Sequence, residues 1–167
     1  MSGSAYHQGE SVAAGASIDF CRLAPGLRQS CLDPALVGAY CSTSYLTDDT
    51  SPLVLRVGQR SDRLASMMAS TGAQHALFIT AWNPNGLALA SAVNALRAEA
   101  LCAAVEERGL AYWNGRGVGD DGLWPPEPSL LVLGGDEALS VELGDYFEQN
   151  AVVVSDGSGE PWLLLLR

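Results

Sequence analysis

The chain has 167 residues, of which 48% are hydrophobic and 17% are charged. This length fits one domain with a sizeable core, and apolar segments lie along the whole sequence, which excludes a largely disordered protein. No apolar run approaches the roughly 18 residues of a membrane span, and the N-terminus lacks the basic and apolar regions of an export signal. We therefore expect a cytoplasmic protein.

Charge is distributed unevenly along the chain. All nine cationic side chains belong to Arg, and the net charge is −10. Residues 117–167 hold one Arg and ten acidic residues, whereas residues 1–116 are nearly neutral. Because this balance repels phosphate backbones and anionic lipid surfaces, we expect neither a nucleic-acid nor a membrane partner. The acidic C-terminal third is a solvated surface, a surface for a basic protein partner, or a mimic of nucleic acid.

The sequence has few residues suited to metal binding or nucleophilic catalysis. Its four Cys include no CxxC pair, and it has only two His, so we expect reduced thiols, no metal site and no cofactor. His7 lies in the N-terminal segment and His75 at the start of a predicted strand. Neither therefore completes a Ser/His/Asp or Cys/His arrangement.

The N-terminal half predicts an arm followed by strands and a helix. Residues 1–32 are rich in Gly, Ser and Ala without periodicity, which is typical of a flexible arm. Asp33-Pro34 is a helix-start signal and predicts a short helical turn. Strand-favouring residues over 39–47 and 53–57 predict two strands, and a helix follows from Ser61 to a stop at Gly72.

The middle of the chain predicts a buried strand and the longest helix. Residues 76–82 form a continuous apolar run of strand length, as expected for a central strand. The helix is expected from about Leu87 to Arg108. Five of its apolar residues fall on one stripe at helical spacing: Leu89, Val93, Leu96, Ala100 and Ala103.

The remaining segments complete a single-domain architecture. Residues 110–113 and 129–133 read as strands joined by a long Gly- and Pro-rich loop, and a helix after Gly134-Gly135-Asp136 precedes a hairpin over 151–166. The expected order is ββαβαββαββ. This order predicts one α+β domain at residues 33–167, a mixed β-sheet with three main helices packed on it.

Several motifs occur in an order that resembles a known family. They are Phe78-Ile-Thr-Ala-Trp-Asn-Pro84, Asn94, Arg97, Gly115, Gly117, Trp124, Glu127-Pro-Ser129, Phe147 and Gln149-Asn150-Ala151. Over roughly residues 36–166 the chain is similar to the uncharacterised bacterial family of domain of unknown function 3293. That family has no assigned activity, so the resemblance implies a fold and no chemistry.

The chain departs from the family at the start of the long helix. The family usually carries Ser-x-x-Glu-Asn there, a pattern that reads as a capping box. Here the corresponding positions are Ala90, Val93 and Asn94. We interpret the missing residues as caps, whose role Asn85 or Ser91 could take.

The segment after the buried strand is the first candidate binding site. It places Thr80, Trp82 and Asn83 at the carboxyl end of that strand, where ligands commonly bind in sheets with helical crossovers. The following helix offers free N–H groups to an anion. Alternatively, Asn83-Pro84 is only a turn, with Trp82 packing beside it.

Three further groups are candidates for the same site. Asn94 and Arg97 share a helix face, and Arg97 could bind a carboxylate or phosphate, or pair with an acidic residue. Glu127 follows Trp124 between two prolines, and a carboxylate with restricted water access could act as general acid or base. It could equally be an exposed acid or a partner of Arg97 or Arg116. The Gly115-Arg116-Gly117 loop lacks the rest of a phosphate-binding motif, but Arg116 could still reach a ligand.

Three functions are compatible with these residues. The first is the binding of a small anionic or polar ligand around Asn83, with the site formed by Thr80, Trp82, Asn83, Asn94, Arg97, Gly115, Arg116, Gly117, Trp124 and Glu127. The second is an enzyme that uses Glu127 as general acid or base and Arg97 to orient an anionic substrate. The third is a protein-interaction module that uses the acidic C-terminal third.

Overall fold

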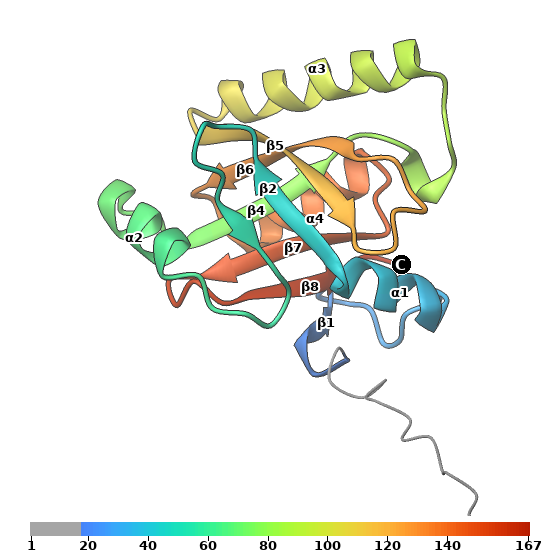
Figure 1. The fold of residues 1–167 in the computed structure, drawn as a ribbon, viewed down its shortest axis with the longest axis horizontal. Coiled ribbons are helices and arrows are strands. Elements are labelled where there is room, and N and C mark those ends of the chain that lie inside the picture. Colours follow the sequence, from blue (N-terminus) through green and yellow to red (C-terminus); the bar gives the residue numbers. More distant parts are fainter. Residues whose placement is uncertain (1–17) are drawn as a thin grey trace, which may run out of the picture.

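The computed structural model describes residues 18–167, which form one eight-stranded sheet covered by helices on both faces (Figure 1). The strands are β1 (Cys21–Leu23), β2 (Thr43–Thr47), β3 (Val54–Leu55), β4 (His75–Thr80), β5 (Ala111–Gly119), β6 (Glu127–Leu133), β7 (Ala151–Asp156) and β8 (Pro161–Leu165). The helices are α1 (Pro34–Cys41), α2 (Asp62–Thr71), α3 (Ser91–Glu107) and α4 (Glu137–Tyr146).

The sheet is mixed, with the spatial order β1-β8-β7-β4-β6-β5-β2-β3. Only the β1–β8 pair is parallel, and all other neighbours within residues 18–167 run antiparallel. The predicted α+β class and mixed sheet are therefore confirmed. The helix count differs from the prediction, because four helices rather than three pack on the sheet in the described part of the chain.

Strand alternation divides the core into two layers, one on each face of the sheet. On one face, Leu77 and Ile79 of β4 pack with Leu101 of α3 and Leu143 of α4. On the other face, Phe78 of β4 packs in the layer that contains α2 and the inner side of α1. The carboxyl end of β4 therefore lies between α1 on one side of the sheet and α3 on the other.

The additional helix is α1, which occupies residues for which a short turn and the start of a strand were predicted. Its start is as expected, because the Asp33 carboxylate accepts a hydrogen bond from the Ala35 N–H at 2.8 Å and Pro34 opens the first turn. The helix then continues to Cys41, and β2 begins only at Thr43. Ala35, Leu36 and Ala39 favour a helix, and together with the start signal at Asp33-Pro34 they outweigh the strand preference of the residues that follow.

The Gly-rich segment predicted as a long loop is mostly strand. β5 extends to Gly119, where it pairs with β2 on one side and, as far as Gly117, with β6 on the other. Only residues 120–126 connect β5 to β6. The extension depends on pairing across the sheet, because glycines provide backbone hydrogen-bonding groups but no side chains that signal a strand.

The N-terminal segment is also more ordered than predicted where the structure describes it. Residues 1–17 of the predicted arm lie outside the described residues. Within residues 18–32, β1 pairs with β8, the Ala24 N–H donates to the Leu165 carbonyl at 2.9 Å, and the Ser30 hydroxyl donates to the Arg167 carbonyl at 2.6 Å. The backbone groups along the edge of β8 supply the partners for this pairing.

α3 differs from its prediction in both its start and its buried face. It begins at Ser91, and its N-cap residue Ala90 makes no side-chain capping bond, so neither Asn85 nor Ser91 replaces the missing cap. The helix packs on the sheet through Asn94, Leu101 and Val105. Its apolar stripe therefore faces away from the sheet. No helix within residues 18–167 is both long and apolar enough to span a bilayer.

His75, at the start of β4, is a buried titratable group whose Nε2 lies 2.8 Å from the Ser140 hydroxyl of α4. Burial lowers the pKa of His75 below its usual value of 6.5, while the carboxylates of Glu137, Asp136 and Asp156 oppose this shift. The unfolded chain therefore takes up the proton more readily than the folded chain. This contribution to stability is present above about pH 6.5 and is lost as the pH falls below it.

Between about pH 7.5 and pH 5.5 we therefore expect the melting temperature of the wild type to fall more steeply than that of His75→Gln. Gln can retain a hydrogen bond to the Ser140 hydroxyl but does not titrate. Thermal unfolding followed by circular dichroism at several pH values measures both slopes. Equal slopes would show that His75 does not contribute to the pH dependence.

Candidate functional site

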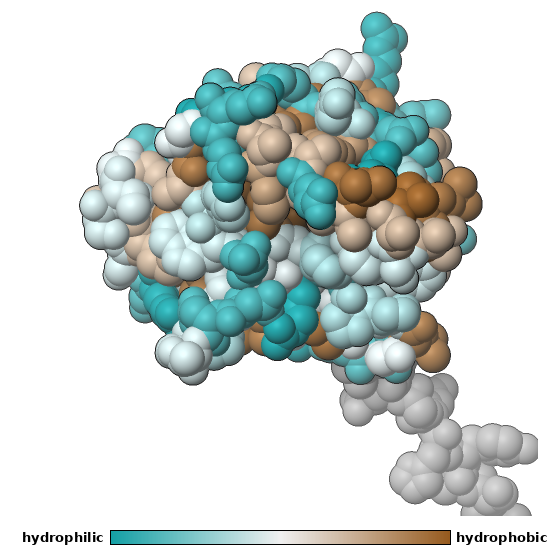
Figure 2. Space-filling model, turned by 90° about the horizontal axis from the view of Figure 1, so that it is seen from above, coloured by the Kyte–Doolittle hydropathy of each residue, from teal (hydrophilic) through white to brown (hydrophobic). Residues whose placement is uncertain are grey.

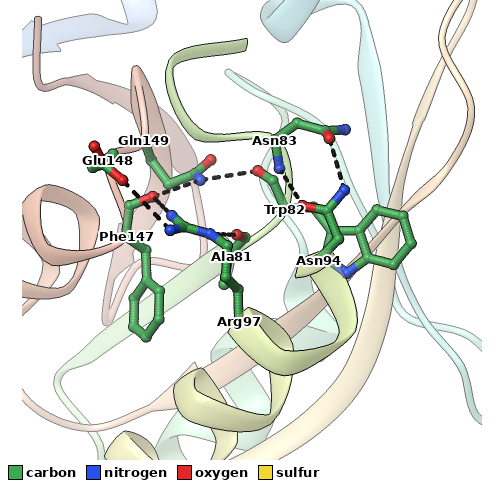
Figure 3. Close-up of polar contacts among 8 residues, drawn as sticks. All are labelled: Ala81, Trp82, Asn83, Asn94, Arg97, Phe147, Glu148 and Gln149. Carbon is green, nitrogen blue, oxygen red and sulfur yellow. Dashed lines mark hydrogen bonds and ion pairs between the residues drawn. The ribbon is translucent and has the colours of Figure 1, made fainter. Parts of the chain in front are cut away.

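Asn83 is the centre of the polar contacts at the end of β4. Its backbone is left-handed, with φ of 48°, and its N–H donates to Oδ1 of Asn94 at 3.0 Å. In return, Nδ2 of Asn94 donates to Oδ1 of Asn83 at 2.8 Å (Figure 3). Because Asn94 is only 1% exposed, this reciprocal amide pair holds the turn against α3. The sequence offered two interpretations of Asn83, a residue that fixes a turn and a polar group at the end of a strand. In the structure Asn83 is both.

The remaining donor of the Asn83 side chain holds Glu127 at the start of β6. Nδ2 of Asn83 donates to Oε1 of Glu127 at 2.6 Å, and Nε1 of Trp124 donates to the same oxygen at 2.8 Å. The other carboxylate oxygen, Oε2, has no hydrogen-bond partner among residues 18–167. Glu127 is thus oriented through one oxygen, and the second is left for another group.

A cavity of about 690 Å³ lies beside these residues on the sheet face that carries α1. Its walls come from α1, β2, the turn after β4, the β5–β6 connection and the residues before β7. Aromatic and aliphatic side chains form much of the lining, including Tyr45, Phe78, Trp124 and Leu163. The ionisable side chains of the lining other than Tyr are Asp120, Asp121 and Glu127. Within the described residues, the cavity is therefore apolar with an acidic charge.

Tyr40 of α1 contributes a hydroxyl to the lining. Its oxygen accepts a hydrogen bond from Nδ2 of Asn150 at 3.1 Å, which leaves the hydroxyl proton free to be donated elsewhere. Burial and the nearby Glu127 charge raise the pKa of Tyr40, although the Asn150 contact opposes the shift. Tyr40 is therefore a neutral donor at physiological pH, on a wall of the cavity to which Glu127 also contributes.

Arg97 does not line this cavity. Its guanidinium instead contacts two backbone carbonyls and one carboxylate. Its Nε donates to the Ala81 carbonyl at 2.8 Å and a terminal nitrogen donates to the Phe147 carbonyl at 2.6 Å (Figure 3). It also lies 3.4 Å from a carboxylate oxygen of Glu148. The guanidinium thus satisfies backbone acceptors after β4 and α4. Its contact with Glu148 corresponds to the pairing with an acidic residue that the sequence left open.

The ten predicted site residues fall into two groups. Lining the cavity are Thr80, Asn83, Gly117, Trp124 and Glu127. Outside its lining are Trp82, Asn94, Arg97, Gly115 and Arg116. In the second group, Asn94 positions Asn83 from behind, whereas Arg116 forms an ion pair with Asp48. The Trp82 ring lies beside Asn94, with its indole N–H buried and unpaired within the described residues (Figure 3).

Sequence reasoning missed the contribution of α1 and β2 to the site. Tyr40 and Tyr45 read as strand residues, and nothing local indicates that they line a cavity to which Glu127 also contributes. Gln149 and Asn150 were not among the predicted site residues, yet both line the cavity. The available signal for these two residues was their membership of the motif Gln149-Asn150-Ala151, one of those that carry the family resemblance. Within residues 18–167, no group of three or more His, Cys, Asp or Glu side chains is arranged to hold a metal ion.

The fold and the site together define an α+β domain with an acidic, aromatic cavity on one face of its sheet. Residues 79–152 match the family model described as protein of unknown function (DUF3293), which confirms the predicted resemblance over that segment. The matched segment includes Asn83, Asn94 and Glu127, whereas Tyr40 and Tyr45 precede it. No curated protein and no solved structure matches the chain.

Proposed function

We propose that the chain binds a small molecule with an apolar body and a neutral polar or cationic head in the cavity beside Glu127. The acidic charge of the cavity supports this proposal most strongly. The lining, as far as the chain is described, contains no Arg, Lys or His and three carboxylates, of which Asp120 is paired with Arg56 while Asp121 and Glu127 have no ion pair among the described residues. A cationic head would pair with Oε2 of Glu127, and the Tyr40 hydroxyl would donate to a polar group of the ligand. The aromatic lining would bury the apolar body.

The same observations bear on the alternatives considered from the sequence. An anionic ligand has little support, because Arg97 is bound to backbone carbonyls and Arg116 to Asp48. The proposed enzyme, in which Arg97 would orient an anionic substrate, has little support for the same reason, because the Arg97 guanidinium is already bonded to backbone carbonyls. A basic protein partner would meet an acidic surface that is partly neutralised, since Asp120, Glu142, Asp145 and Glu148 each pair with an Arg.

A thermal-shift screen that compares primary amines, neutral polar compounds, carboxylates and sugar phosphates tests the proposal. We expect aromatic or aliphatic amines to raise the melting temperature, since a ligand at about 100 times its dissociation constant adds about 2.7 kcal/mol of stability. Shifts produced by carboxylates or phosphates, with none from amines or neutral compounds, would contradict the proposal.

Glu127→Gln is expected to weaken the binding of an amine found in that screen by about 10- to 100-fold, because the substitution removes the charge while keeping an acceptor for Asn83 and Trp124. Isothermal titration calorimetry measures the change. Glu160→Gln is the matched control, since Glu160 is exposed and lies outside the cavity lining. Equal affinities of the two variants would show that Glu127 does not contact the ligand.

A further inference from the structure

Two half-buried cysteines, Cys21 and Cys41, have their sulfur atoms in contact. The two Sγ atoms lie 3.6 Å apart, although the residues are separated by 20 positions in the sequence. In a disulfide the two sulfurs are about 2.05 Å apart. The approach needed to form the bond is therefore about 1.5 Å, a movement that rotation of the two side chains can supply.

Regular secondary structure holds both cysteines in place. Cys21 begins β1 and pairs with Leu163 of β8, and Cys41 is the last residue of α1. The end of α1 is fixed as well, because the Ser42 N–H donates to the Gly38 carbonyl at 3.0 Å. Both cysteines pack against the core layer that contains Leu163. The contact between the sulfurs is therefore set by two ordered elements and by the core beneath them.

The other two cysteines are placed differently. Cys31 is exposed in the segment between β1 and α1, and Cys102 lies in α3. Neither makes a sulfur–sulfur contact with another cysteine within residues 18–167. α3 lies on the face that Figure 2 shows, whereas β1 and α1 lie at the other end of the molecule (Figure 1). Cys21 and Cys41 are therefore the cysteines that are positioned to react with each other.

The surroundings of Cys41 give the two thiols different parts in such a reaction. Burial, together with the hydrogen bond and the charge of the neighbouring Cys21, raises the pKa of Cys41 to about 12. Because the thiolate is the nucleophile, the first attack on an oxidant falls to Cys21. Once Cys21 is part of a mixed disulfide it carries no charge, and one cause of the raised pKa of Cys41 is removed. Cys41 then ionises more readily for the second step.

We propose that Cys21 and Cys41 are a redox modification site, oxidised reversibly to an intramolecular disulfide by a low-molecular-weight disulfide. The Cys21 thiolate attacks one sulfur of the oxidant, whose S–S bond breaks, and the other half leaves as a thiolate and takes up a proton. Cys41 then gives up its proton and attacks Sγ of Cys21, and the second half of the oxidant leaves as a thiol. Two protein thiols are oxidised, and one disulfide is reduced to two thiols. The reduced thiols expected from the sequence are the starting state.

The bond ties an edge strand to a helix. β1 has three residues and pairs only with β8 among the described strands, and α1 contributes one wall of the cavity. A link between residues 20 positions apart also restricts the unfolded chain. The oxidised protein is therefore more stable than the reduced protein, with β1 and α1 held to each other.

Peptide mapping in the Cys31→Ser variant identifies the bond. Trypsin cleaves this chain only after Arg, because it has no Lys, and this leaves Cys21 in peptide 1–22 but Cys31 and Cys41 together in peptide 29–56. Replacing the exposed Cys31 removes that ambiguity. After incubation with an excess of oxidised glutathione, we expect a non-reducing digest to contain the two peptides joined. Non-reducing electrophoresis should show a single chain.

Thermal unfolding of the same variant measures the effect of the bond. Oxidised Cys31→Ser protein should melt about 5–10 °C above the reduced form, and dithiothreitol should reverse the shift. The matched control combines Cys31→Ser with Cys41→Ser and should show no shift. The mapping changes neither reacting cysteine, so it decides the proposal even if Cys41→Ser disturbs the fold. Cys21 and Cys41 that both stay alkylatable, glutathione retained on Cys21, or an equal shift in the control would overturn the proposal.

Discussion

Replacing Arg97 with alanine is expected to lower the free energy of unfolding by about 3 kcal/mol. The guanidinium donates to the carbonyls of Ala81 and Phe147, and the substitution leaves both without this partner in a half-buried site. The contact with Glu148 adds little, because that carboxylate is largely exposed. Urea unfolding measured by circular dichroism gives the difference.

Two variants accompany that experiment. Arg60→Ala removes an exposed Arg that pairs only with Asp62 among the described residues, and should change the unfolding free energy by less than about 0.5 kcal/mol. Arg97→Lys keeps the charge but not the planar fork, so it should recover less than half of the loss. If Arg97→Ala were as stable as Arg60→Ala but bound ligand poorly, Arg97 would have to be reassigned from a structural role to the binding site.

Gly115→Ala is expected to destabilise the fold by about 3 kcal/mol through overpacking. Gly115 lies inside β5 with strands on both sides, and an added Cβ would collide with the Leu46 carbonyl oxygen and lie 3.1 Å from the Phe78 ring. Neither the β2 backbone nor the buried Phe78 can move without disturbing its neighbours. Thermal or urea unfolding of the variant measures this loss.

Gly117→Ala, two residues further along the same strand, is the matched control. Its added Cβ would meet Thr43 and Tyr45 at ordinary contact distances of 3.5 Å or more. We therefore expect a change in unfolding free energy within about 1 kcal/mol. Equal losses for the two glycines would mean that the collision with the Leu46 carbonyl does not determine the effect, because strand propensity alone favours Ala over Gly.

Sequence pattern predicted the elements whose signals are local. The apolar run of β4, the capped helix α2 and the closing hairpin of β7 and β8 each carry their own markers, and all three are present. β1 and the Gly-rich end of β5 have no such markers. Both exist because partner strands far away in the sequence offer backbone groups to them. α3 shows another limit of prediction from sequence. Its helical spacing is evident, but which face is buried depends on Asn94, whose side chain bonds to Asn83 in the folded protein.

The candidate site was predictable to a similar degree. The strand end at Asn83, the amide of Asn94 and the carboxylate of Glu127 were expected near one another, and the structure joins them by direct hydrogen bonds. The target of Arg97 was not predictable, because its acceptors are backbone carbonyls and every residue has one. Tyr40 was missed because α1 reaches the cavity only through the folding of the whole sheet.

The parallel pairing of β1 with β8 has a consequence for how the chain folds as it is made. Cys21 pairs with Leu163, so about 140 residues separate the two strands in the sequence. During synthesis on the ribosome, the segment at Cys21–Leu23 emerges early and must wait for its partner until almost all of the remaining sheet has been translated. Closing so large a loop makes β1 a late addition to the sheet. Until then the edge of the sheet at β8 does not exist, and the first strand of the described residues is among the last to be ordered.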